Sequence, residues 1–186
     1  LRIRDWLAGR RDIEVSTLEE NQRKEHAARR AAIEAADLTL LCLPDQAAVE
    51  AAQWAGECAT RVIDASAVHR VADGWIYGLP ELGEARREAI RNARFVANPG
   101  CYPSAFILLI RPLVDAGLLP HNAPVSIHAL SGYSGGGRGL VEKWESPEQN
   151  LSSLPYEAPY ALGAQHKHVP EMLAYSGLTV EPQFIP

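Results

Sequence analysis

The chain has 186 residues and a formal net charge of −5 at pH 7, with 47% hydrophobic and 22% charged residues. This length allows a sizeable core in one full domain or two small ones. The sequence has no basic block of the kind that binds nucleic acid and no apolar run long enough to span a membrane. Its three cysteines (Cys42, Cys58 and Cys101) lie far apart, which fits a reducing compartment and predicts a cytoplasmic protein.

Both ends of the sequence suggest a piece of a longer protein. Residues 1–7 have the pattern of an amphipathic helix, but no helix start signal precedes them. Residues 183–186 stop inside an expected strand or just beyond it. We therefore expect further chain on both sides.

The first half alternates between strands and helices. Strands are expected over residues 12–18, 38–43, 61–64 and 95–97, and helices over residues 21–36, 46–58 and 83–92. The run Leu38–Leu43 is continuously apolar, as in strands that are buried on both faces. The alternation predicts an α/β fold with a parallel sheet wound on both sides, where ligands bind beyond the carboxyl ends of the strands.

Polar residues follow three of these expected strands. They occur in Leu43-Pro44-Asp45, in Asp64-Ala65-Ser66 and in Asn98-Pro99-Gly100-Cys101. Because the carboxyl ends of parallel strands meet at one edge of the sheet, we expect the three segments to converge there. The sequence contains no glycine-rich nucleotide fingerprint, but the chain starts inside the helix that such a loop would precede.

Cys101 lies where the strand 95–97 ends and a helix begins, with apolar residues at helical spacing over residues 105–117. Pro103 fits the first helical turn, where its missing N–H costs nothing. Backbone N–H groups and the positive end of the helix dipole would favour the thiolate over the thiol. The residues alone leave two interpretations open, a reactive nucleophile or a small buried apolar side chain.

The second half has a different character. A strand is expected over residues 125–130, followed by the polar loop Ser131–Gly139 and by an irregular segment over residues 147–159. The serines, glycines and single arginine of the loop are suited to bind an anion through backbone N–H groups, and a flexible linker is the alternative. A helix is expected to begin at Glu171.

Two histidines, His166 and His168, precede that helix. Their pattern is compatible with metal ligands, with an acid/base pair or with two ordinary polar side chains. We expect no metal site, because no cysteine or carboxylate stands at metal-ligand spacing from them. A thiol and an imidazole that the fold brings together would form a nucleophile and its proton partner.

Four segments carry a family resemblance in their order along the chain: Val62–Arg70, Trp75–Leu82, Ala97–Pro103 and Gly163–Glu171. With the serine–glycine loop, they resemble the shorter bacterial branch of the N-acetyl-gamma-glutamyl-phosphate reductases of arginine biosynthesis, within the aspartate-semialdehyde dehydrogenase-like superfamily. The resemblance implies a Rossmann-like NADP-binding domain over residues 1–101, without its first strand and glycine-rich loop. It also implies an α+β catalytic domain over residues 102–186, without its C-terminal part.

The resemblance implies a reversible, NADP-dependent reductive dephosphorylation of a small-molecule substrate. The Cys101 thiolate would attack an acyl phosphate, and hydride would reduce the resulting thioester to a semialdehyde, with His166 as proton donor and acceptor. The matching substrate positions are Arg70, Asn98, Tyr160 and Glu171, among which the Arg70 guanidinium suits a phosphate or carboxylate. The matching cofactor positions are Leu43, Pro44, Ser66, Ser131, Gly132, Ser134, Gly135 and Gly136. The implied assembly is a homo-oligomer, either a dimer or a tetramer.

Other functions remain open at this point. Aspartate-semialdehyde dehydrogenase shares the fold and the cysteine mechanism, but its pattern fits residues 98–103 and 165–171 poorly. A reductase of a carrier-linked glutamyl or aminoadipyl phosphate is nearer in sequence. A cysteine hydrolase would use Cys101 and His166 without a nicotinamide, and a non-catalytic binding module would need no reactive thiol. The choice between NADP and NAD also stays open, because the glycine-rich loop is absent.

Overall fold

The computed structural model describes residues 2–148, 150 and 166–186. In chain order its elements are α1 (Arg2–Leu7), α2 (His26–Glu34), β1 (Leu38–Leu41), α3 (Asp45–Gly56), β2 (Arg61–Asp64), β3 (Ile76–Tyr77), the 3₁₀ turn η1 (Pro80–Leu82), α4 (Glu84–Asn92), β4 (Phe95–Ala97), α5 (Cys101–Asp115), β5 (Ser126–His128), the 3₁₀ turn η2 (Tyr133–Gly136), α6 (Arg138–Glu145), α7 (Val169–Ser176) and β6 (Gln183–Ile185). The α/β class expected from the sequence is confirmed. None of the described helices is long and apolar enough to cross a membrane.

A four-stranded parallel sheet, in the order β1-β2-β4-β3, organises the first half of the chain. Its register places the last residues of the strands side by side, with Asp64 paired to Leu41 on one side and to Ala97 on the other. The polar segments after β1, β2 and β4 therefore share one edge, as expected. We call residues 43–45, 64–70 and 98–101 the carboxyl edge.

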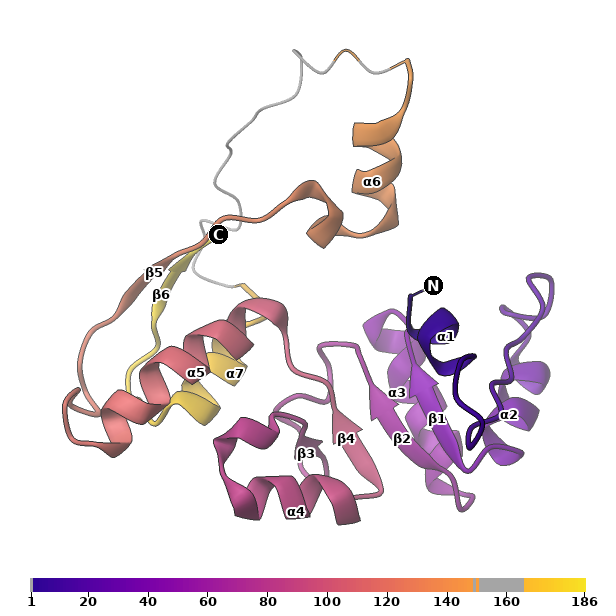
Figure 1. Cartoon of the computed structure of the whole chain (residues 1–186), viewed down its shortest axis with the longest axis horizontal. Coiled ribbons are helices and arrows are strands. Elements are labelled where there is room, and N and C mark those ends of the chain that lie inside the picture. Colours follow the sequence, from indigo (N-terminus) through magenta and orange to yellow (C-terminus); the bar gives the residue numbers. More distant parts are fainter. Residues whose placement is uncertain (1, 149, 151–165) are drawn as a thin grey trace.

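The sheet and its helices enclose a first core. Small alanines on α3 let that helix pack closely on the strands, and it covers one face of β1 and β2 (Figure 1). The buried residues of this core are Ile33, Leu41, Ala51, Ala55 and Val62. This packing holds the start of α3 at the carboxyl edge.

A second core lies between α5, α7 and the two-stranded parallel sheet of β5 and β6 (Figure 1). Its buried residues include Phe106 and Ile107 of α5, Met172 of α7 and Phe184 of β6. Tyr77 of β3 belongs to the same core, although β3 is a strand of the first sheet. The two halves of the chain are therefore joined through β3.

Residues 131–145, which we call the arm, follow β5 and stand apart from both sheets (Figure 1). Residues 131–139 were expected to form a flexible polar loop, but they contain the turn η2 and the start of α6. Gly137 has φ +79°, a left-handed conformation that lets the chain reverse into the helix. All residues from Ser131 to Gly139 are exposed.

Several other expectations need correction. The strand expected over residues 12–18 is absent, and Ile13 and Val15 are 41% and 36% exposed there. β1 is an edge strand of the sheet and pairs with β2 alone among the described strands, so residues 12–18 form no ladder with it. The helix expected from residue 21 begins at His26, since residues 19–25 form hydrogen-bonded turns. The strand β3 and most of α6 were not predicted, whereas the bounds of β2 and β4 are confirmed.

Candidate active site

Cys101 is the first residue of α5, with Gly100 as the N-cap. The Ser104 hydroxyl and backbone N–H both donate to the Gly100 carbonyl, at 2.8 and 3.0 Å, and so close the first turn. The Cys101 side chain is exposed, which excludes the buried apolar interpretation. A thiol here is accessible and lies at the positive end of a helix of 15 residues.

Gly100 packs too closely against its neighbours to carry any side chain. A Cβ atom at this position would lie 2.6 Å from Oε1 of Glu171, 2.7 Å from Nη1 of Arg70 and 2.9 Å from Nε2 of His168. All three distances are shorter than real carbon contacts. The turn before the nucleophile candidate therefore requires glycine because of close approach, not because of a positive φ.

Glu171 is the buried acceptor that this turn packs against. Its carboxylate, in a residue with 1% exposure, accepts the Gly100 N–H at 3.0 Å and the Tyr77 hydroxyl at 2.9 Å on Oε2. Its Oε1 accepts from Nη1 of Arg70 at 2.7 Å. Burial raises the pKa of Tyr77, and the Glu171 carboxylate adds to that rise, so the hydroxyl stays a donor.

Arg70 connects the loop after β2 to the two neighbouring segments. Its Nε donates to the Asn98 carbonyl at 3.1 Å and its Nη2 to the Ala65 carbonyl at 3.3 Å. The Tyr175 hydroxyl donates in turn to the Arg70 carbonyl at 2.9 Å. Arg70 and Glu171, which were both expected to bind substrate, thus form an ion pair with each other. Asn98, the third expected substrate-binding residue in this region, is exposed.

His166 and His168 stand at the entrance to α7. The His166 ring centroid lies 6.3 Å from that of Tyr102, the residue after Cys101, and 4.6 Å from that of His168. The two histidines also share a hydrogen bond, from the His168 backbone N–H to Nδ1 of His166 at 3.2 Å. Partial burial and then the charge of Lys167 lower the pKa of His166, which favours the neutral imidazole that accepts a proton.

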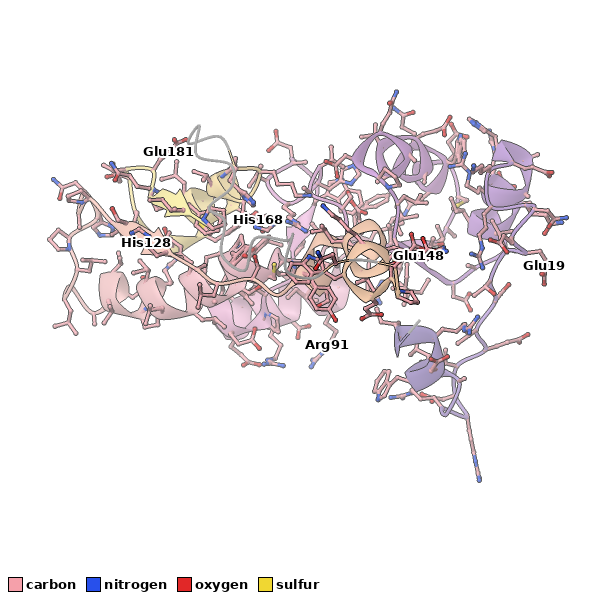
Figure 2. The ribbon with its side chains drawn as sticks, turned by 90° about the horizontal axis from the view of Figure 1, so that it is seen from above. Glu19, Arg91, His128, Glu148, His168 and Glu181 are labelled. Carbon is pink, nitrogen blue, oxygen red and sulfur yellow. The ribbon has the colours of Figure 1, made fainter. Side chains whose placement is uncertain are left out.

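His168 is the more buried histidine, with 6% exposure. Burial lowers its pKa to about 4, with further contributions from His166, Arg70 and Lys167. Its Nδ1 has no hydrogen-bond partner among the described residues. Figure 2 shows His168 inside the outline of the molecule, whereas Glu19, Arg91 and Glu181 lie at its periphery. His168 is therefore a neutral packing residue next to the turn, and His166 is the more accessible imidazole.

Asp64 shapes the loop that contains Ser66. This fully buried carboxylate accepts the Ser66 backbone N–H at 3.0 Å and its hydroxyl at 2.5 Å. It also bonds Nδ1 of His69 at 2.6 Å, and the His69 ring stacks on Trp75 with centroids 4.0 Å apart. Asp64 was expected only as a polar residue at a strand end, and this bonding role was not predicted. Its signal is an aspartate that ends an apolar strand, with Ser66 and His69 soon after it.

The expected cofactor residues fall into two groups. Leu43, Pro44 and Ser66 lie at the carboxyl edge, where the Asp45 side chain accepts the Ala67 backbone N–H at 3.0 Å. The others lie on the arm, which stands apart from that edge (Figure 1): Ser131, Gly132, Ser134, Gly135 and Gly136. The expected substrate residue Tyr160 lies outside the described residues.

An open hollow of about 440 Å³ borders Pro44 at the start of α3. It is lined by His26, Arg29, Pro44, Gln46, Ala47 and Glu50. The Arg29 guanidinium is already engaged here, because its Nη2 lies 3.9 Å from the Glu50 carboxylate and its Cζ lies 5.7 Å from the centroid of the Trp54 ring. The feature of this hollow that suits an anionic group is the N-terminus of α3 beside Pro44. Within residues 2–148, 150 and 166–186, no three His, Cys, Asp or Glu side chains gather to hold a metal ion.

Two family models match the chain. The semialdehyde dehydrogenase NAD-binding domain matches residues 8–93, and the semialdehyde dehydrogenase dimerisation domain matches residues 101–186. The solved structure of aspartate semialdehyde dehydrogenase II from Vibrio cholerae shares the fold, with a TM-score of 0.59 and 16% identity over 82% of this chain and 52% of that chain. The chain therefore belongs to the semialdehyde dehydrogenase superfamily.

Within that superfamily, the resemblance found in the sequence is confirmed by relatives that match along the whole chain. The N-acetyl-gamma-glutamyl-phosphate reductase of Burkholderia lata is 49% identical, and N-acetyl-gamma-glutamyl-phosphate reductase 2 of Pseudomonas putida is 50% identical, each over 186 residues. Both matches cover 100% of this chain but 58% and 59% of the relatives. The chain thus spans less than two thirds of the relatives' length.

Proposed function

We propose that the protein reduces N-acetyl-gamma-glutamyl phosphate to N-acetyl-glutamate 5-semialdehyde in arginine biosynthesis, in the cytoplasm. The observation that carries this proposal is the exposed Cys101 at the start of α5 and at the carboxyl edge of a parallel sheet, where the adjacent Tyr102 ring lies 6.3 Å from that of His166. The similarity to reductases of this name along the whole chain supports the choice of substrate.

In this proposal Cys101 is the nucleophile. Its thiolate attacks the acyl carbon, the C–S bond forms, and the C–O bond to the phosphoryl group breaks so that phosphate leaves. The thioester that remains on Cys101 is a better hydride acceptor than an oxygen ester. His166 accepts the thiol proton and, once hydride has added to the thioester carbon, protonates the developing oxyanion. It takes this proton back as the C–S bond breaks, so that the semialdehyde leaves and the Cys101 thiolate is restored.

The proposed cofactor is NADP, which supplies the hydride when bound. Leu43, Pro44 and Ser66 would contact it from the carboxyl edge, and the arm residues 131–136 would approach it from the other side. The N-terminus of α3 beside Pro44 supports an anionic ligand at this end of the sheet, because its backbone N–H groups point toward such a group. Because the arm stands apart from the edge, this proposal requires the arm to move toward the ligand.

We further propose that two copies of the protein associate through the region of α5. Apolar side chains are exposed on α5 and just after it, with Leu109 at 67% and Leu118 at 76%. Exposed leucines of this kind mark protein interfaces, and the model that matches residues 101–186 is described as a dimerisation domain. Leu109→Glu should therefore shift the sedimentation coefficient of the full-length protein toward that of the monomer.

The deciding experiment uses the full-length protein and N-acetyl-glutamate 5-semialdehyde. We expect reduction of NADP that depends on added phosphate, because the reverse reaction needs phosphate to release the acyl group from Cys101. Parallel assays replace the substrate by aspartate semialdehyde or a carrier-linked substrate, or replace NADP by NAD. Each replacement should give a lower kcat/KM. NADP reduction without phosphate would instead indicate an aldehyde dehydrogenase that releases its thioester to water. Phosphate release from the acyl phosphate without nicotinamide would indicate a hydrolase, and the absence of turnover in every assay would overturn the proposal.

A further inference from the structure

The turn before Cys101 and the segment that carries His166 come from different halves of the chain. The turn follows β4 of the four-stranded sheet, and the histidine precedes α7, which packs on α5 in the second core. Chemistry between two such groups needs a separation set to within a fraction of an ångström. Some contact must therefore join the turn to the entrance of α7.

Glu171 makes that contact directly. It lies five residues after His166, in the first turn of α7, and its Oε2 accepts the backbone N–H of Gly100 at 3.0 Å. Gly100 is the residue immediately before Cys101. A single side chain thus spans from the histidine segment to the nucleophile's own backbone.

The carboxylate is held in place from two other directions. Tyr77 of β3 donates to the same oxygen, and Arg70 of the loop after β2 donates to the other one. The Cβ position of Gly100 lies within 3 Å of Glu171, Arg70 and His168, so the turn cannot shift without meeting one of them. With 1% exposure, the carboxylate has no surface left for a substrate in this arrangement.

We infer that Glu171 is a positioning residue, which fixes the Gly100–Cys101 turn to the His166 segment, rather than a group that contacts the substrate. This role rests on the proposed function, because it assigns Cys101 and His166 as the two groups to be aligned. The carboxylate charge is neutralised by Arg70, so Glu171 contributes geometry at Cys101 more than charge. Glu171 was expected from the sequence to bind substrate. In this inference it instead holds the backbone of the residue next to Cys101.

The test uses Glu171→Gln in the full-length protein. An amide has one acceptor oxygen, so it cannot accept from both Arg70 and Gly100, and its NH₂ group faces one of these donors. Hydrogen exchange is measured without substrate by mass spectrometry of the peptide over residues 95–106. One amide of this peptide, which we assign to Gly100, should exchange roughly tenfold faster than in the wild type. In turnover, kcat should fall by roughly tenfold to a hundredfold with KM little changed.

Met172→Ala is the matched control. Met172 is the next residue on α7 and is fully buried, so its truncation weakens the same helix without removing the bond to Gly100. At a temperature where both variants are folded, Met172→Ala should keep the wild-type exchange of the 95–106 peptide and the wild-type kcat. If it lowers kcat as much as Glu171→Gln does, the effect is general destabilisation and the inference fails.

Glu171→Asp keeps the inference testable if the glutamine variant does not fold. Aspartate retains the charge opposite Arg70 but is one methylene shorter, so we expect a folded protein with about threefold faster exchange of the 95–106 peptide. Wild-type exchange in the variants would overturn the positioning role, and a rise in KM at constant kcat would assign Glu171 to substrate binding. If the Glu171 variants exchange faster but the wild-type protein lacks the proposed reductase activity, the proposed function is overturned. The contact by which Glu171 positions the Gly100–Cys101 turn would still stand.

Discussion

The carboxyl edge and the arm both contain residues that the family resemblance assigns to the site, but the two regions are built differently. The edge contains the buried carboxylate of Asp64, which bonds Ser66 and His69, and it packs against the buried Glu171 of α7, which accepts from Arg70 and Gly100. On the arm, every residue from Ser131 to Gly139 is exposed. The described side-chain bonds of the arm, Arg138 to Glu142 and Tyr133 to Glu145, stay within it.

This difference separates geometry that exists before a ligand binds from geometry that a ligand must induce. A buried carboxylate with several donors is strongly disfavoured in other positions, because any shift leaves charged or polar groups unpaired. Exposed ion pairs within one helix contribute little and restrain little. We therefore expect the edge to respond to mutation through stability and turnover, and the arm through cofactor affinity.

The largest effect should come from the thiol at the edge. Cys101→Ser should lower turnover by more than about a hundredfold, since serine ionises far less readily and its ester accepts hydride poorly. Cys58→Ser is the control, because that thiol lies just after α3 and contacts the Ala55 carbonyl at 3.6 Å. Steady-state kinetics decide the matter: a serine variant with more than about a hundredth of the wild-type rate is incompatible with a nucleophile at this position.

The second prediction separates the two histidines. His166→Asn should lower kcat by about a hundredfold and remove one limb of the pH profile, whereas His168→Asn should leave that limb in place. Since burial lowers the pKa of His166 from its usual 6.5, its neutral form persists into more acidic solution and the acid limb should lie below pH 6.5. Greater damage from His168→Asn would reverse the assignment.

Two glycine-to-alanine substitutions, one at the carboxyl edge and one on the arm, compare how strongly each region affects the free energy of unfolding. Gly100→Ala should cost about 3 kcal/mol, because its Cβ would lie under 3.0 Å from Glu171, Arg70 and His168. Gly135→Ala on the arm should change stability by less than about 0.5 kcal/mol, since nothing lies within 4 Å of its Cβ position. Urea unfolding of both variants measures the contrast, and equal losses would mean that the turn is not tightly packed in solution.

The buried His168 should make the free energy of unfolding depend on pH. Its pKa of about 4 in the folded protein lies below the usual 6.5 expected after unfolding, so the unfolded chain binds the proton more tightly. Stability should therefore be complete above about pH 6.5 and decline toward pH 4, with this histidine contributing up to about 1.4 kcal/mol per pH unit. In His168→Gln the decline should be shallower in urea unfolding, and an unchanged slope would show that His168 is not the group responsible.

The smallest effect is expected on the arm. Arg138→Ala removes an exposed pair with Glu142 and should leave the thermal midpoint unchanged. If the arm moves to the cofactor, the same variant should weaken NADP binding in calorimetry by roughly fivefold, the cost of one charge-assisted contact. Lys143→Ala, an exposed cation on the same helix, is the control. Equal affinity in both variants would place the cofactor phosphates away from Arg138.

Local rules were sufficient for much of the fold. The apolar runs that end at Asp64 and Ala97 predicted β2 and β4 with their observed bounds, and the break at residues 98–100 predicted the helix that begins at Cys101. The strand expected over residues 12–18 failed because a strand needs a neighbour, which no pattern within the segment can supply. The short strand β3 escaped notice because its two residues are extended by pairing with β4 rather than by their own pattern.

The sequence by itself determined the chemical groups of this protein: the thiol at a helix start, the histidine pair and the polar strand ends. Only the tertiary structure decided which of them meet. Glu171 lies 71 residues from Gly100, 94 from Tyr77 and 101 from Arg70 along the chain, and no spacing rule connects such positions. They meet because α7 packs on α5 while β3 pairs with β4, and because a buried carboxylate is stable only where donors surround it.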